Sequence, residues 1–183
     1  MAEHRADVFL DPAADPREGA PSLLDEKGTL QEYLRSHRLT LELKCADLDA
    51  EQLACRSVPP STMSLLGLVR HMAHVERVWF KIRCDQQDVP RLYQTEEDPD
   101  GDFNGAVPDP ACVEDAWARW REEVTFAEQY VEACADLATT YTHPRDGSRF
   151  SMRELLVHMI EEYARHNGHA DLLRECVDGR VGQ

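Results

Sequence analysis

The sequence contains no long apolar run and no recognisable secretion signal. A membrane-spanning helix needs roughly 20 consecutive apolar residues, and no stretch of this 183-residue chain approaches that length. The first 19 residues hold acids and prolines but lack the apolar segment of a signal peptide. We therefore expect a cytoplasmic protein, and the chain is long enough to bury one hydrophobic core.

Basic residues are also scarce. The chain has 20 lysines and arginines against 35 acids, so its formal net charge is −15. Such a charge repels the phosphate backbone of nucleic acids and anionic lipid surfaces. We therefore expect no nucleic-acid partner and no membrane partner, and consider cations and small molecules instead.

The six cysteines form no recognisable framework. None belongs to a CxxC pair, and they are too sparse in a chain of this length for a disulfide scaffold. We interpret them as reduced thiols packed like small hydrophobic residues, as is usual in the cytosol.

Apolar residues recur at helical spacing in four segments, at about 29–47, 62–83, 109–137 and 151–177. Thr29 and Ser151 each open a capping box, and Asp109 is an N-cap followed by proline at the first helical position. Four amphipathic helices without a convincing strand predict an all-α four-helix bundle.

Three segments lie outside this pattern. Residues 1–24 contain three prolines and are expected to form an N-terminal arm, partly disordered or draped over the bundle domain at 25–178. Residues 84–108 form a long connection between the second and third helices, and residues 141–150 form a turn. Connections as long as 84–108 are usually functional or mobile.

Two polar side chains interrupt the apolar stripe of the last helix. Glu162 and His166 fall within about 20° of Leu155 at the centre of that stripe, whereas Glu161 points away from it. A buried ionised carboxylate is costly unless it is paired. A carboxylate and an imidazole one turn apart project side by side, so together they can hold a cation.

The second helix offers two further histidines. His71 lies at the edge of its apolar face and His74 points outward, so His71 is the better third ligand. The alternative is that Glu162 and His166 form an ion pair in the core without a metal. His169 could compete with Glu162 or support a ligand from behind. His37 and the three tryptophans are expected to be packed core residues.

Two segments carry a resemblance to the DinB-like superfamily, in a branch often described only as a domain of unknown function. They are residues 63–80, MSLLGLVRHMAHVERVWF, and residues 162–174, EYARHNGHADLLR. The resemblance covers about residues 29–177. It implies a four-helix bundle with three metal ligands, one on the second helix, at His71, and two on the last helix.

The last-helix motif distinguishes this chain from many DinB-like proteins. Many members have His-x3-His there, whereas this chain has Glu162-x3-His166. The variant is similar to the mycothiol-dependent maleylpyruvate isomerases. Members with activity use low-molecular-weight thiols such as mycothiol or bacillithiol, as S-transferases or isomerases, and the resemblance implies such a function here.

We therefore expect a metal-dependent thiol S-transferase or isomerase with His71, Glu162 and His166 as ligands. This donor set suits Zn²⁺, with Ni²⁺, Mn²⁺ and Fe²⁺ as alternatives, and leaves an open position for substrate. The ion would lower the pKa of a bound thiol such as mycothiol, and the thiolate would attack an electrophile. His169 or His74 could move a proton, and residues 84–108 could cover the site.

Two other functions remain open at this stage. The bundle could bind a metal or small ligand without turnover, or it could be a helical interaction module that holds no metal. The sequence leaves both monomer and homodimer possible.

Overall fold

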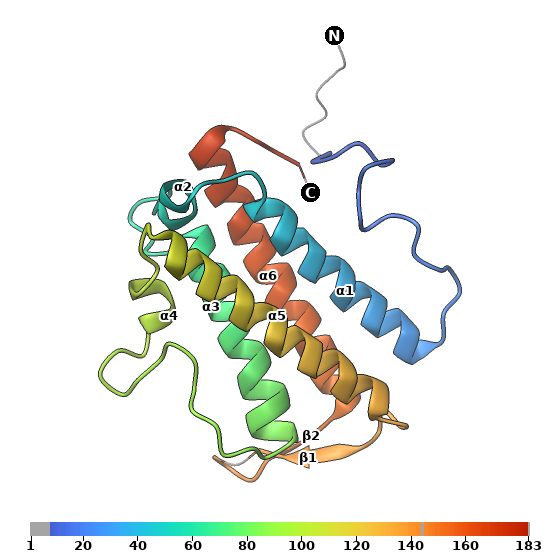
Figure 1. Ribbon diagram of the computed structural model, residues 1–183. Coiled ribbons are helices and arrows are strands. Elements are labelled where there is room, and N and C mark those ends of the chain that lie inside the picture. The colour runs from blue at the N-terminus through green and yellow to red at the C-terminus, as the bar shows by residue number, and fades with distance from the viewer. Residues whose placement is uncertain (1–7, 144, 183) are drawn as a thin grey trace.

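Four long helices form an antiparallel bundle in the computed structural model, which describes residues 8–143 and 145–182 (Figure 1). The second of these four helices in chain order continues without a break into a π-helix. The bundle helices are α1 (Glu26–Cys45), α3 (Leu65–Glu76) with η1 (Arg77–Cys84), α5 (Pro110–Ala133) and α6 (Met152–Asp178). The predicted all-α bundle is therefore confirmed.

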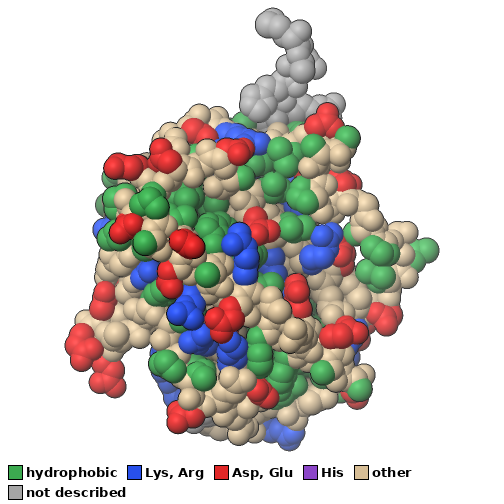
Figure 2. All heavy atoms as spheres, viewed as in Figure 1, with side chains coloured by type: hydrophobic (Ala, Val, Ile, Leu, Met, Phe, Trp, Pro, Cys, Tyr) green, Lys and Arg blue, Asp and Glu red, His purple; other side chains and the backbone are tan. Residues whose placement is uncertain are grey.

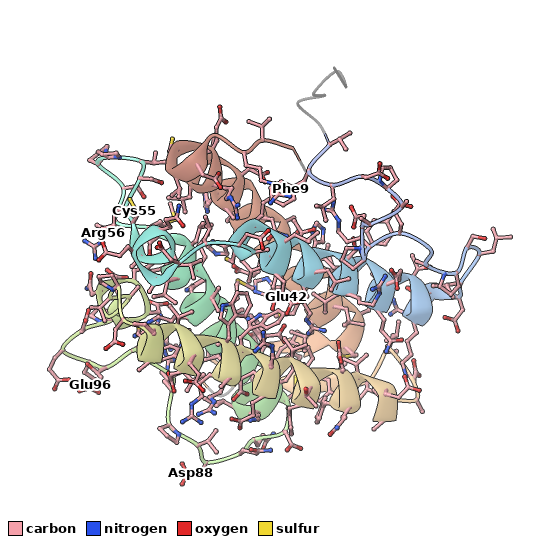
Figure 3. The ribbon with its side chains drawn as sticks, turned by 45° about the horizontal axis from the view of Figure 1, so that its top comes forward. Phe9, Glu42, Cys55, Arg56, Asp88 and Glu96 are labelled. Atoms are coloured by element: carbon pink, nitrogen blue, oxygen red, sulfur yellow. The ribbon has the colours of Figure 1, made fainter. Side chains whose placement is uncertain are left out.

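The helices of the bundle pack most closely in two pairs. α1 lies along α6, and α3 lies along α5. Side chains from neighbouring helices fill the space between the ribbons (Figure 3). Leucines and methionines from these helices are almost completely buried, and burying one such side chain contributes roughly 1.5–3 kcal/mol. The core residues include Leu41, Leu66, Met72, Leu156 and Met159.

The predicted starts of two helices are confirmed by their caps. The Asp109 side chain accepts a hydrogen bond from the amide of Ala111, with proline at the start of α5. Ser151 and Glu154 form both hydrogen bonds of a capping box at the start of α6. Both caps satisfy amides that the first turn of a helix leaves unpaired.

The start of α1 was predicted one turn too late. Asp25, not Thr29, is the N-cap, and its carboxylate accepts a hydrogen bond from the Gly28 amide. An aspartate is as good a cap as a threonine, and no proline interrupts the residues between the two positions. The helix therefore extends back to the earlier cap.

Three short elements were not predicted. They are α2 (Ala50–Ala54), α4 (Gly101–Asn104), and an antiparallel hairpin of β1 (Thr140–Thr142) and β2 (Arg149–Ser151). The hairpin, residues 140–151, includes the whole segment predicted to be a turn. Elements of three to five residues are too short for apolar periodicity to reveal them.

Residues 8–24 contain no helix or strand and lie over the bundle. Phe9 is 7% exposed, and its ring contacts the cationic groups of Lys44, Arg174 and Arg180. Arg17 donates a hydrogen bond to the Thr40 hydroxyl on α1. Residues 8–24 thus contact the bundle through Phe9 and Arg17, whereas residues 1–7, also assigned to the predicted arm, lie outside the described residues.

The surface carries interspersed charges. Figure 2 shows acidic and basic side chains side by side on one face, with small apolar areas between them. Asp88 and Glu96, on the connection between η1 and α5, are exposed and project away from the bundle (Figure 3). No helix among the described residues is long and apolar enough to cross a membrane.

Candidate metal centre

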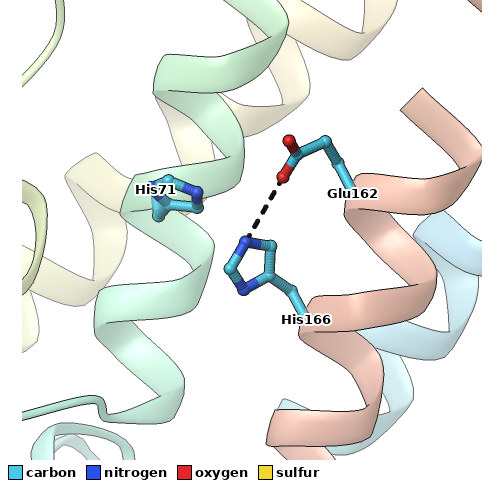
Figure 4. Close-up of side chains that lie close together, drawn as sticks. All are labelled: His71, Glu162 and His166. Atoms are coloured by element: carbon cyan, nitrogen blue, oxygen red, sulfur yellow. Dashed lines mark ion pairs between the residues drawn. The ribbon is translucent and has the colours of Figure 1, made fainter. Parts of the chain in front are cut away.

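Three side chains predicted from the sequence meet between α3 and α6. His71 comes from α3, and Glu162 and His166 come from α6 (Figure 4). One potential ligand atom from each lies within 4.8 Å of the other two. The structure therefore brings His71 together with two residues that lie 91 and 95 positions later in the chain.

Helical geometry places the two α6 side chains next to each other. They are four residues apart, and the Nε2 atom of His166 lies 3.5 Å from a carboxylate oxygen of Glu162. The side chains of Glu162, His71 and His166 are 27%, 19% and 11% exposed. The cluster is therefore partly shielded from water yet open to a small molecule.

The carboxylate of Glu162 is stabilised in its ionised form. The hydrogen bond from His166 and the nearby His158 lower the pKa of Glu162, against burial, which alone would raise it. Nε2 of His158 lies 3.4 Å from the other carboxylate oxygen. An ionised carboxylate is the form that coordinates a cation.

His71 is held on two sides by the connection between η1 and α5. Its Nδ1 atom lies 2.8 Å from the Oδ2 atom of Asp102. Its ring stacks on Phe103, with the ring centres 5.3 Å apart. On its remaining side, the edge of the His166 ring approaches with a centre-to-centre distance of 4.6 Å.

Asp102 is a buried carboxylate that the sequence did not reveal. Its side chain is 1% exposed, and burial alone would raise its pKa. Hydrogen bonds from His71, Gln94 and the Phe103 amide outweigh burial and lower the pKa of Asp102. Asp102 lies in a segment without periodicity, so only the folded chain shows that it touches His71.

His169 and His74, the two histidines that the sequence suggested for proton transfer, differ from each other in their surroundings. His169 lies behind the cluster, with its Nδ1 atom 3.4 Å from Nδ1 of His166, and burial lowers its pKa. His74 was predicted to face outward, and this is wrong because it is 5% exposed. A helical wheel cannot show that the connection through Leu92 packs over this side of α3.

The residues of the cluster fit a divalent ion. Two imidazoles and one carboxylate are common ligands of Zn²⁺, which they approach to about 2.0–2.2 Å. Two such ligands therefore lie up to about 4 Å apart across one ion. The separations here, within 4.8 Å, need only a small side-chain adjustment to reach that range.

Comparison with known proteins gives the family. The family model for mycothiol-S-transferase matches residues 29–179. In fold, the chain is similar to a conserved protein from Enterococcus faecalis of known crystal structure, with a TM-score of 0.60 and 16% sequence identity. The similarity covers 85% of this chain and 99% of that one. No curated relative gave a significant match. The chain therefore belongs to the mycothiol-S-transferase family, which is DinB-like.

Proposed function

We propose that this protein is a metal-dependent S-transferase that uses a low-molecular-weight thiol of the mycothiol type. The observation that carries the proposal is the convergence of His71, Glu162 and His166 at one partly open place in the bundle. The family supports the choice of thiol. We infer that these three side chains hold the ion, and that the protein acts in the cytoplasm.

The donor set favours zinc among the available ions. Two imidazoles and a carboxylate suit Zn²⁺, although Ni²⁺, Mn²⁺ and Fe²⁺ accept the same ligands. Three protein ligands leave a coordination position free, which is typical of catalytic sites. An ion held there would lower the pKa of a bound thiol, so that the thiol would be present as a thiolate at neutral pH.

The surrounding residues prepare the site for this chemistry. A divalent ion together with the carboxylate of Glu162 and two imidazole ligands would carry one net positive charge, which would attract a thiolate. Phe103 stacks on His71 and shields one side of the site from water. To His158, which lies next to Glu162 and is 35% exposed, we assign the role of accepting the thiol proton and passing it to water. The thiolate sulfur would then bond to the electrophilic carbon while the bond from that carbon to its leaving group breaks, and the leaving group would depart with the electron pair, as chloride does from monochlorobimane.

His74 is a poorer choice for moving that proton. Burial lowers its pKa to about 4, so it stays neutral and shielded at neutral pH. His169 contacts His166 from behind. We therefore assign it to the support of a ligand, and we assign no proton transfer to it.

The proposal is tested by metal analysis and by a conjugation assay. We expect about one Zn²⁺ per chain in purified protein, and zinc-dependent transfer of mycothiol to monochlorobimane. Chelation should abolish the activity and added Zn²⁺ should restore it. Glu162→Gln should lose both metal and activity, whereas Glu161→Gln, on the exposed side of the same helix turn, should keep both.

The same experiment separates the competing functions. Bound metal without turnover across several thiols and electrophiles would favour a bundle that only binds a ligand. Absence of stoichiometric metal, with no effect of Glu162→Gln, would overturn the proposed site and leave an ion pair in the core. Thiol-dependent rearrangement of a substrate without net conjugation would indicate an isomerase.

A further inference from the structure

The connection between η1 and α5 is fixed to α3 next to His71. Arg70, which precedes His71, donates hydrogen bonds to the carbonyl oxygens of Asp102 and Gly101 at 2.8 and 3.0 Å. Its guanidinium lies 3.8 Å from the centre of the Tyr93 ring. Arg70 is 8% exposed. These contacts anchor the short helix α4 against α3.

The backbone of α4 also approaches its neighbours too closely for a side chain. A Cβ atom on Gly101 would lie 2.2 Å from the Tyr93 carbonyl oxygen, and one on Gly105, which directly follows α4, would lie 2.6 Å from the Arg70 guanidinium and 2.9 Å from the Gly101 carbonyl oxygen. Glycine is therefore required at both positions. Asp102 and Phe103, between these two glycines, both contact His71.

We propose that Asp102 is a positioning residue that holds the neutral His71 ring with its proton on Nδ1 and thereby presents Nε2 to the ion. The role toward the ion rests on the proposed function, whereas the tautomer of His71 does not. The inference stands on the 2.8 Å contact between Nδ1 and Oδ2 and on the burial of Asp102.

The chemistry of the pair determines where the proton sits. An ionised carboxylate accepts hydrogen bonds and donates none, so the ring nitrogen facing it must carry the proton. The other ring nitrogen then keeps its lone pair. Histidine ligands of metal ions commonly donate their second N–H to a carboxylate, which fixes the ring orientation and strengthens the ligand.

The two carboxylate oxygens of Asp102 have different partners, which determines how an asparagine side chain would be oriented at this position. The backbone amide of Phe103 donates to Oδ1 at 3.1 Å, while Oδ2 faces His71. Oδ2 also accepts a hydrogen bond from the side-chain amide of Gln94 at 3.1 Å. In Asp102→Asn the backbone N–H of Phe103 stays a donor, whereas the Gln94 amide can rotate its oxygen toward a new NH₂ group. The amide oxygen would therefore stay opposite the Phe103 N–H, and the NH₂ group would face Gln94 and Nδ1 of His71. An NH₂ donor requires an acceptor. The variant should therefore move the proton of His71 to Nε2 and block that nitrogen as a ligand.

The experiment measures the tautomer in metal-free protein. Protein labelled with ¹⁵N-histidine, at a pH where His71 is neutral, should show Nδ1–H for His71 in the wild type and Nε2–H in Asp102→Asn. His71→Gln assigns the signal. Asp100→Asn is the matched control, because Asp100 is exposed, lies two residues away, and makes no side-chain cap bond. It should leave the His71 tautomer unchanged.

Metal affinity provides the second readout. Competition with a chromophoric chelator should show Zn²⁺ binding weakened by about 10–100-fold in Asp102→Asn, and changed by no more than about 2-fold in Asp100→Asn, because an exposed charge is screened. Denaturant unfolding of both variants verifies that the fold is kept.

The two proposals fail in different ways. The same His71 tautomer in wild type and Asp102→Asn, in a folded variant, would overturn the role of Asp102 even if zinc binds. A tautomer that changes as expected in a protein that binds no metal would keep the positioning role and refute the proposed metal centre.

Discussion

The two sides of the bundle where helices pack less closely differ in what they offer a ligand. Between α1 and α5 lies an open groove of about 800 Å³, a size typical of small-molecule sites. Its floor is apolar, formed by Leu34, Ala127, Val131 and Leu156. Between α3 and α6, by contrast, two imidazoles and a carboxylate converge.

The charges of the groove are already paired. Arg35 forms an ion pair with Glu32 on the same helix. Arg38 binds the buried Glu76 and approaches Glu128. None of the three proposed ligands lines the groove. Open volume alone therefore does not indicate a reactive site, whereas ligand atoms that converge with fixed orientations do.

A buried polar network lies between the two sides. Tyr163, next to Glu162, donates a hydrogen bond to Glu76 at 2.8 Å and accepts one from the Trp120 indole at 2.9 Å. Arg38 completes the network through Glu76. Each of the four long helices thus contributes one member, and the network fixes α3 and α6 relative to each other.

The largest expected effect comes from breaking this network. Glu76→Gln leaves the Arg38 guanidinium buried without its counter-charge, which typically destabilises a protein by about 3–5 kcal/mol. Urea unfolding measures the change. Glu128→Gln removes the exposed partner of the same arginine and should cost no more than about 1 kcal/mol. Equal losses in both variants would mean that the buried pair has no special role.

The second largest effect is expected from removing one of the three proposed metal ligands, which should abolish the stabilisation by zinc. At a zinc concentration of 100 times Kd, binding stabilises the wild type by about 2.7 kcal/mol, which raises Tm by roughly 5–10 °C for a protein of this size. His166→Ala should lose this increase. Arg35→Met, on the groove side, should retain it. A smaller increase in Arg35→Met than in the wild type would mean that the groove also contributes to metal binding.

A smaller effect concerns the pH dependence of stability. Burial lowers the pKa of His74 to about 4 from an ordinary value of 6.5, so the unfolded chain takes up the proton more readily. Stability from this group is therefore lost as the pH falls from about 6.5 towards 4, by about 1–2 kcal/mol at pH 5. Metal-free His74→Gln should lose less stability between pH 7 and pH 5 than the wild type. Parallel pH profiles would show that His74 is accessible to solvent.

The smallest effect is expected at the rim of the groove. Arg35 and Glu32 are three residues apart on α1 and partly exposed. A double-mutant cycle with Arg35→Met and Glu32→Gln should give a coupling free energy of about 0–1 kcal/mol. A much larger value would indicate that the groove is more strongly organised than its contacts suggest.

The sequence predicted the parts of the site that depend on helix periodicity. Glu162 was distinguishable from Glu161 because only one of them lies on the apolar stripe of α6. Asp102 was not predictable, because its segment has no period and its partner is 31 residues earlier in the chain. His74 was placed wrongly for a related reason: the wheel assumes that the side of α3 away from the core faces solvent, but the connection covers it.

X-ray absorption at the zinc edge tests the central claim most directly. Zinc-loaded protein should show nitrogen and oxygen neighbours at about 2.0–2.2 Å with the signature of two imidazoles and no sulfur, and added mycothiol should introduce one sulfur at about 2.3 Å. A sulfur neighbour before thiol is added, or none afterwards, would contradict a centre built from His71, Glu162 and His166 that activates a thiol.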